Sequence, residues 1–101
     1  MEDKYKVVIV DDDPVSLNAL QFQLGSYSDL VLEGVAKNGV SGIHLIEKVH
    51  PNLLFLDVEL PDMKGMDVLA RLSSFFRNGM HVVFYTAHRI NLTLNLALSM
   101  A

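Results

Sequence analysis

Two short runs of consecutive apolar residues constrain the fold of this chain more than any other feature. They are Val7–Val10 and Leu53–Leu56, and neither run alternates with polar residues. A strand with one face in water would alternate, so these runs predict strands that are covered on both faces. Strands of this kind are typical of a parallel sheet with helices on both sides.

Helical patterns separate the predicted strands. Asp13-Pro14 after the first run is typical of a helix N-cap followed by the first helical residue. Further strands are predicted at 30–35 and 80–86, and helices at 14–24, 40–49, 66–76 and 90–101. The alternation of strand and helix predicts an α/β fold with a doubly wound parallel sheet.

The last predicted helix, 90–101, is apolar over most of its circumference. At about 100° per residue, Asn91, Asn95 and Ser99 form one narrow polar wedge. Such a helix should be buried or meet a partner. We expect its second apolar face to pack on chain that would follow Ala101.

Composition narrows the class of protein. A chain of 101 residues, half of them hydrophobic, indicates one domain with a real core. The net charge of −4 argues against a nucleic-acid surface, and the absence of cysteine excludes disulfides. No signal peptide is visible, and no apolar run approaches the ~18 residues of a membrane span. We therefore expect a cytoplasmic protein.

Acidic residues follow the predicted strands at their carboxyl ends, where open parallel sheets bind ligands. Asp11, Asp12 and Asp57 would lie close together if their strands are neighbours. Two such charges ~4 Å apart repel by ~4 kcal/mol at an effective dielectric of 20, so the cluster should raise a pKa or hold a cation. Oxygen ligands of this kind suit Mg²⁺. Alternatively these acids only charge a helix N-terminus, a role that we assign to Asp13.

Asp57 is also a candidate nucleophile toward phosphorus, because a rigid strand places its carboxylate beside the predicted metal site. Its simpler interpretation is an Asx turn. Thr86, at a later strand end, could donate its hydroxyl to a phosphoryl oxygen, or could only reflect β-propensity. Glu59 is expected to face the metal with its backbone carbonyl.

The four histidines lack the spacing of a zinc site. We interpret all of them as structural or surface residues, although His88 borders the predicted site. They are His44, His50, His81 and His88.

Together these residues resemble the receiver domain of bacterial two-component response regulators. The segments that carry the resemblance are Val7–Pro14, Leu54–Gly65 and Val83–Ala87. The resemblance implies the flavodoxin-like strand order 2-1-3-4-5. It implies a phosphoacceptor domain that is not an enzyme, served by a sensor histidine kinase and joined to an output domain in a longer chain. The segments around Asp57 and Thr86 look most similar to receivers of LytTR-type regulators.

The resemblance also assigns roles to site residues. Asp57 would accept the phosphoryl group and ligate Mg²⁺ together with Asp12, while Asp11 would act through water and Glu59 through its backbone carbonyl. Thr86 would bond the phosphoryl group and move inward on phosphorylation. The backbone amide of Ala87 would be a second donor.

One departure from the family pattern is a missing lysine. Receivers carry a lysine at the end of a fifth strand, whereas the last lysine of this sequence is Lys64, in the predicted loop after the third strand. We therefore expect residues 1–101 to form a receiver that is incomplete at its C-terminus and lacks the fifth strand and fifth helix. The fourth strand would be an unpaired edge, which favours a homodimer or a domain-swapped assembly.

Two other functions compete with this interpretation. A pseudo-receiver would keep the fold as an interaction module without phosphorylation. An aspartate-nucleophile phosphatase of the haloacid-dehalogenase type is suggested by Asp57-Val58-Glu59, but that family places the motif on its first strand.

Overall fold

The computed structural model describes residues 4–86 and 89–95, and it forms one five-stranded sheet of order β2-β1-β3-β4-β5. Strands β1 to β4 are parallel, and β5 is antiparallel to β4. The expected order of the four parallel strands, 2-1-3-4, is therefore confirmed. The strands are β1 (Tyr5–Val10), β2 (Leu30–Ala36), β3 (Leu53–Asp57), β4 (His81–Thr86) and β5 (Arg89–Asn95). The helices are α1 (Pro14–Leu24), α2 (Gly39–Val49), α3 (Gly65–Arg71) and α4 (Ser73–Arg77).

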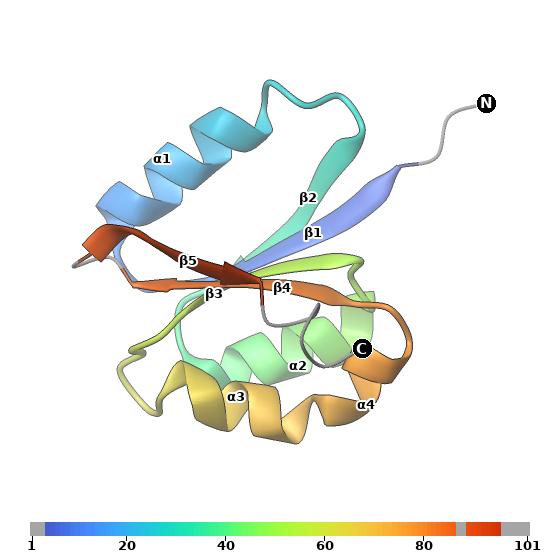
Figure 1. The fold of residues 1–101 in the computed structure, drawn as a ribbon, viewed down its shortest axis with the longest axis vertical. Helices are drawn as coiled ribbons and strands as arrows, with labels where there is room; N and C mark the ends of the chain where they lie inside the picture. Colours follow the sequence, from blue (N-terminus) through green and yellow to red (C-terminus); the bar gives the residue numbers. More distant parts are fainter. Residues whose placement is uncertain (1–3, 87–88, 96–101) are drawn as a thin grey trace.

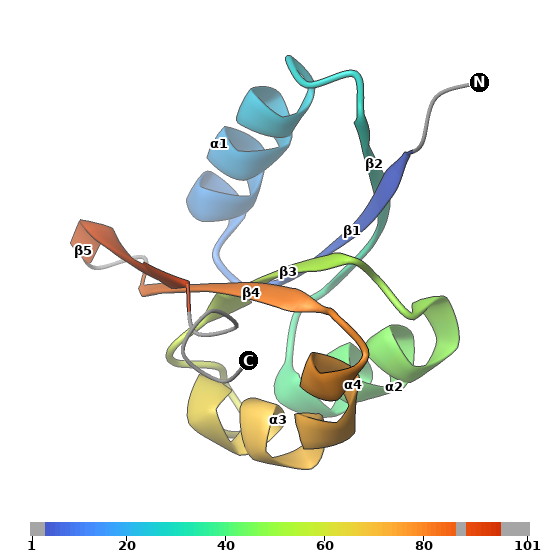
Figure 2. The same ribbon diagram turned by 45° about the vertical axis from the view of Figure 1, so that its right-hand side comes forward.

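Helices lie on both faces of the sheet. Helix α1 covers one face, and α2, α3 and α4 lie together on the other (Figure 1). The rotated view separates the same two groups of helices (Figure 2). This is the layered α/β arrangement that the continuous apolar strands predict.

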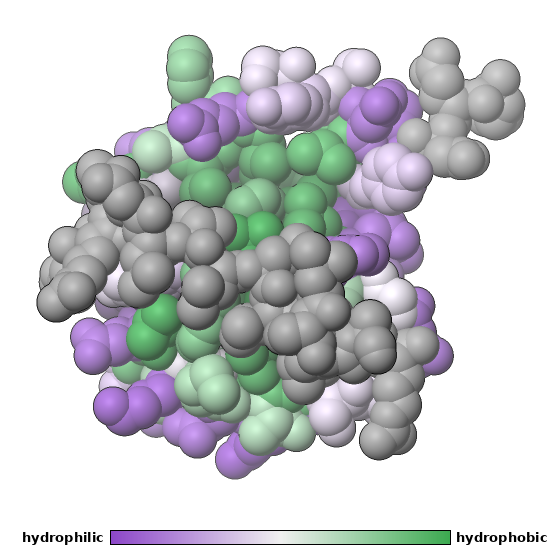
Figure 3. All heavy atoms as spheres, viewed as in Figure 1, coloured by the Kyte–Doolittle hydropathy of each residue, from purple (hydrophilic) through white to green (hydrophobic). Residues whose placement is uncertain are grey.

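The two faces have separate apolar cores, because side chains alternate along each strand. Val8 and Val10 of β1 belong to the larger core under α2 and α3, whereas Val7 and Ile9 point to the α1 side. All four side chains are fully buried. The α1 side is covered less completely, and apolar surface is visible between α1 and strands β1 and β2 (Figure 3).

Side-chain caps start the first two helices, and the first of them lies at Asp13 as the sequence predicts. The Ser16 amide donates to the Asp13 carboxylate at 2.9 Å, and Pro14 occupies the first turn of α1. The Ser41 amide donates to the Asn38 side chain at 2.8 Å at the start of α2. Each cap satisfies an amide that has no partner inside the helix.

The helix predicted at 66–76 is interrupted. Helix α3 begins at Gly65 and ends at Arg71, and Leu72 has φ −110° and ψ 19° before α4 begins at Ser73. Leu72 is fully buried, as its place in the apolar stripe predicts. Two serines follow it, and serine is a weak helix former because its hydroxyl competes for backbone hydrogen bonds.

The prediction of a helix at 90–101 is wrong for the part of that range that the structure describes, because Arg89–Asn95 form strand β5. Ile90, Leu92 and Leu94 alternate with polar residues, which is the period of a strand. The edge of β4 offers unpaired backbone groups, and β5 satisfies them. The prediction that β4 stays unpaired is therefore also wrong, and the sheet has a fifth strand, of antiparallel direction. Residues 96–101 lie outside the described part of the chain.

Candidate functional site

Three carboxylates meet at the carboxyl end of the sheet. Val10 of β1 is in register with Leu56 of β3, so the acids that follow these residues come together. Asp11, Asp12 and Asp57 each offer one oxygen, and these oxygens all lie within 4.8 Å of one another. The convergence predicted from the sequence is confirmed.

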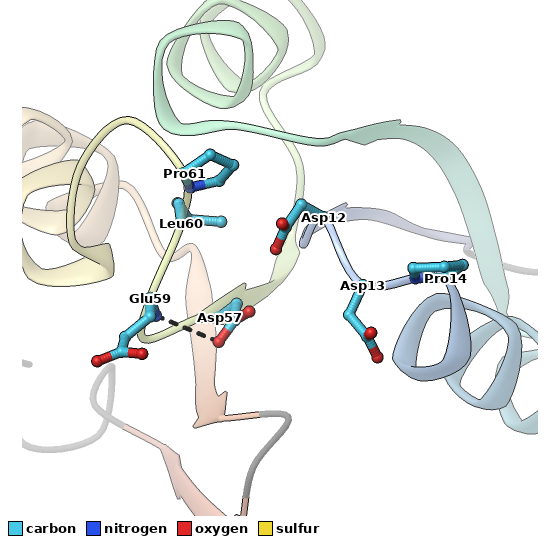
Figure 4. Close-up of a pocket in the computed structure, with 7 residues that line it drawn as sticks. All are labelled: Asp12, Asp13, Pro14, Asp57, Glu59, Leu60 and Pro61. Atoms are coloured by element: carbon cyan, nitrogen blue, oxygen red, sulfur yellow. Dashed lines mark hydrogen bonds between the residues drawn. The ribbon is translucent and has the colours of Figure 1, made fainter.

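Asp12 and Asp57 border a hollow of about 380 Å³ on the surface. Asp12 and Asp57 face each other across it, with the loop after β3 on one side and the start of α1 on the other (Figure 4). The lining residues are Asp12, Asp13, Pro14, Asp57, Glu59, Leu60 and Pro61. Asp12 is exposed, so a ligand could reach the hollow from solvent.

Asp57 is only 4% exposed, although it is a carboxylate. Burial raises its pKa from 3.8 to about 6, the Glu59 amide lowers it in part, and the charges of Asp11 and Asp12 raise it again. The Glu59 amide donates to Asp57 Oδ1 at 3.2 Å. A carboxylate held in this way becomes fully ionised at neutral pH most readily when a cation is near.

Asp11 lies behind the hollow and is fully buried. The Asp13 amide donates to its Oδ1 at 2.9 Å, and the Tyr85 hydroxyl donates to its Oδ2 at 2.6 Å. Burial, followed by the bond to Asp11, raises the pKa of the Tyr85 hydroxyl, so this group remains a donor. Sequence reasoning missed Tyr85, because its register opposite Asp57 and its contact with Asp11 are features of the folded sheet.

The loop after β3 is held by backbone bonds at both of its ends. The Val58 amide donates to the Tyr85 carbonyl at 2.7 Å, and the Gly65 amide donates to the Val58 carbonyl at 2.6 Å. Glu59 itself is exposed, and its backbone forms an isolated antiparallel β-bridge with Lys64. Its carbonyl as a metal ligand stays a prediction.

Gly65 is required by close packing at the base of this loop. A side chain there would collide with the Asp57 carbonyl and lie 2.5 Å from the Phe84 ring. The lack of a side chain at Gly65 therefore lets the end of the loop pack directly against the backbone of Asp57.

Asp62 anchors the same loop to helix α2, which sequence reasoning also missed. Its carboxylate accepts from the Gly39 amide at 2.7 Å and from the Val40 amide at 2.9 Å. These two bonds lower the pKa of Asp62. Asp62 and Asn38 thus cap α2 together, and Asp62 reaches it from 22 residues away in the sequence.

The remaining predicted site residues lie as follows. Thr86 is half-buried at the end of β4, directly after Tyr85, and its role toward a phosphoryl group stays a prediction. Ala87 and His88 lie outside the described residues. His44, His50 and His81 are exposed, and among the described residues the acids Asp11, Asp12 and Asp57 are the group whose spacing suits a metal ion.

The donor set fits a hard divalent cation such as Mg²⁺. All three groups are carboxylates, and the two that line the hollow leave positions open for water or phosphate oxygens. Burial is the main cause of the raised pKa of Asp57, and the charges of Asp11 and Asp12 add to it, so a cation at this cluster would favour the ionised carboxylate.

Comparisons with known proteins agree with this geometry. Residues 7–100 match the family model described as "Response regulator receiver domain". The transcriptional regulatory protein BtsR of Escherichia coli K12 is 37% identical over 82 residues, which cover 81% of this chain and 34% of that protein. The nitrate/nitrite response regulator protein NarL of the same strain is 32% identical over 78 residues, covering 77% and 36%.

Solved structures show the same fold. The signal receiver domain of the response regulator NarL from Mycobacterium tuberculosis aligns with a TM-score of 0.78 at 25% identity, covering 99% of this chain and 80% of that one. The chain spans about a third of the length of the curated relatives that it matches.

Proposed function

Because the chain belongs to the response regulator receiver domain family, we propose that Asp57 is its phosphoacceptor and takes a phosphoryl group from a sensor histidine kinase. The observation that supports this role is the position of Asp57. It is a nearly buried carboxylate with a raised pKa that lines an open hollow beside a second acid. Such a group is a candidate nucleophile whose position is set by the strand that precedes it.

The transfer is a displacement at phosphorus. A carboxylate oxygen of Asp57 attacks the phosphorus of a phosphohistidine, an O–P bond forms, and the P–N bond breaks. The imidazole that leaves takes up a proton. The product is an aspartyl phosphate, and the domain acts as a signalling acceptor rather than as an enzyme.

Mg²⁺ is the proposed cofactor. Asp12 and Asp57 would hold it directly, Asp11 through water, and Glu59 through its backbone carbonyl. Bound there, Mg²⁺ would neutralise charge on the acids and on the phosphoryl oxygens. This chain's own contribution is to keep Asp57 fixed through Gly65 and the Glu59 amide.

The signal would pass from this site to other parts of a longer protein. Thr86 and the Ala87 amide would bond the phosphoryl group, and inward movement of Thr86 would change the adjoining surface. An output domain that regulates transcription is proposed because BtsR, a relative, is named a transcriptional regulatory protein. A LytTR-type output stays within this proposal. A cytoplasmic location is also part of this proposal, since the proposed partner is the kinase of a two-component system. Separately, none of the described helices is both long and apolar enough to cross a bilayer.

Self-association as a homodimer or a swapped assembly also stays a proposal. An open edge at β4 no longer supports it, because β5 pairs with β4. Strand β5 is itself an edge of the described sheet, and an edge strand can pair with a second chain. Analytical ultracentrifugation tests it, and a clean monomer at high concentration would contradict it.

The test of the phosphoacceptor role is intact-mass spectrometry after incubation with a small acyl phosphate and Mg²⁺. Wild type should gain one phosphoryl group, and Asp57→Asn should gain none. Asp29→Asn, a change at an exposed acid away from the site, is the matched control and should behave as wild type.

The pseudo-receiver remains the second candidate, because the same fold and the same acidic cluster would be present in a domain that is not phosphorylated. It predicts a folded protein that forms no adduct under the same conditions. The phosphatase alternative finds no support, since the Asp57 motif ends β3, the third strand in sequence order, rather than the first.

A further inference from the structure

Both carboxylate oxygens of the buried acid Asp11 accept a hydrogen bond from the protein. Its Oδ1 accepts from the Asp13 amide, and its Oδ2 accepts from the Tyr85 hydroxyl at 2.6 Å. Asp12 and Asp57 line the hollow, whereas Asp11 is fully buried behind them. The carboxylate of Asp11 is therefore turned toward the protein.

Tyr85 reaches Asp11 because of its place in the sheet. It is in register with Asp57, and its carbonyl accepts from the Val58 amide at 2.7 Å. Side-chain alternation puts Tyr85 on the opposite face from its neighbour Phe84, which packs in the larger core. One residue of β4 thus contacts the strand that carries Asp57 and the acid that follows β1.

We propose that Tyr85 is a positioning residue that holds Asp11 behind the hollow, so that Asp11 supplies charge to a bound divalent cation without ligating it directly. A hydroxyl that donates to a carboxylate forms a short, strong bond and fixes the orientation of the acid. Groups that orient the acids around a metal typically change its affinity ~10–100-fold when they are removed. The inference rests on the proposed metal site.

The first arm of the test is the Mg²⁺ dissociation constant, measured by calorimetry on the whole chain. Tyr85→Phe removes the hydroxyl and keeps the ring, and we expect it to weaken binding at least ~10-fold. Tyr5→Phe and Tyr27→Phe are matched controls, because both tyrosines are exposed, and both should bind as wild type. Unchanged or tighter binding by Tyr85→Phe would overturn the proposal.

The second arm asks whether Tyr85 acts through Asp11. In an Asp11→Asn background the acid is already neutral, so Tyr85→Phe should change the Mg²⁺ affinity no more than ~2-fold further. A loss equal to that in the wild-type background would show that Tyr85 acts by general packing, and would overturn the inference.

The third arm is spectroscopic and needs no loss of function. The chain has three tyrosines and no tryptophan, so its near-ultraviolet difference spectrum on adding Mg²⁺ reports mainly on tyrosine. The double variant Tyr5→Phe/Tyr27→Phe should keep the difference spectrum, and Asp11→Asn should lose it. This measurement does not depend on the folding of Tyr85→Phe. Loss of the difference spectrum in Tyr5→Phe/Tyr27→Phe would contradict the role of Tyr85.

The outcomes also separate this inference from the proposed function. If wild type and Tyr85→Phe bind Mg²⁺ with equal dissociation constants, only the role of Tyr85 is contradicted. Wild type that binds no Mg²⁺ contradicts the metal site itself, and the role of Tyr85 falls with it.

Discussion

Asp57 combines burial with negative neighbours, so its protonation affects the stability of the metal-free protein. Its pKa of about 6 lies above the ordinary value of 3.8. A carboxyl with a raised pKa binds its proton more tightly in the folded than in the unfolded chain. Protonation of Asp57 therefore stabilises the fold below about pH 4, and this contribution is lost as the pH rises through 6.

The metal-free protein should accordingly become less stable between pH 4 and pH 7 because of Asp57. Asp57→Asn removes the charge, so it should raise the free energy of unfolding at pH 7 by ~1–3 kcal/mol and flatten the pH dependence. Urea unfolding in a chelating buffer measures both effects. Asp29→Asn should leave the slope unchanged, and an Asp57→Asn protein less stable than wild type at pH 7 would contradict the account.

At the scale of elements, the loop after β3 is attached to its surroundings at several points. Asp62 ties it to the start of α2, and Gly65 packs its end against β3 and β4. Neither Asp62 nor Gly65 lines the hollow, but both attach the loop that carries Glu59 and directly follows Asp57. The following two variants separate these attachments.

Asp62→Asn should loosen the contact between the loop and α2. An asparagine keeps one acceptor oxygen but loses the charge that favours a helix N-terminus. We expect a lower melting temperature and faster hydrogen exchange at the Gly39 and Val40 amides. The difference from wild type should vanish in acid, because Asp62 has a lowered pKa and stabilises the fold only while ionised. Glu47→Gln, on the surface of the same helix, is the control, and equal exchange in the two variants would refute the contact.

Gly65→Ala tests the close packing under Asp57. Alanine favours a helix over glycine by ~1 kcal/mol, but overpacking costs ~1–3 kcal/mol, and the collision with the Asp57 carbonyl should win. We expect a net loss of stability in chemical unfolding and slower formation of the acyl phosphate. In Gly25→Ala the added methyl would lie 3.4 Å from the nearest backbone oxygen, so this control should be neutral. A Gly65→Ala protein as stable as wild type would contradict the packing.

The elements also show what the sequence could predict and where it failed. Strands β1 and β3 and the caps Asp13 and Asn38 follow from local patterns, so they were predictable. The segment after Thr86 carries both a helical and a strand period, and the open edge of β4, a long-range feature, selects the strand. Propensity alone could not choose between them.

At the scale of the whole molecule, the sheet brings the site together. Strand order 2-1-3-4-5 puts β1 beside β3, so acids 46 positions apart in the sequence meet at one edge. The acids Asp11, Asp12 and Asp57 were predictable because fold class and strand ends suffice to place them. Tyr85 and Asp62 were not, since their roles depend on side-chain reach between elements that only three-dimensional packing reveals.

The receiver function proposed for this domain depends on the transfer of a phosphoryl group from a sensor kinase to Asp57. The most direct measurement is residue-level mass spectrometry after phosphotransfer from a phosphohistidine donor and reduction of the acyl phosphate with borohydride, which converts a phosphorylated aspartate to homoserine. We expect homoserine at position 57 and at no other acidic position. Modification at Asp12 or at a histidine, or none in protein shown to be folded and Mg²⁺-bound, would contradict it.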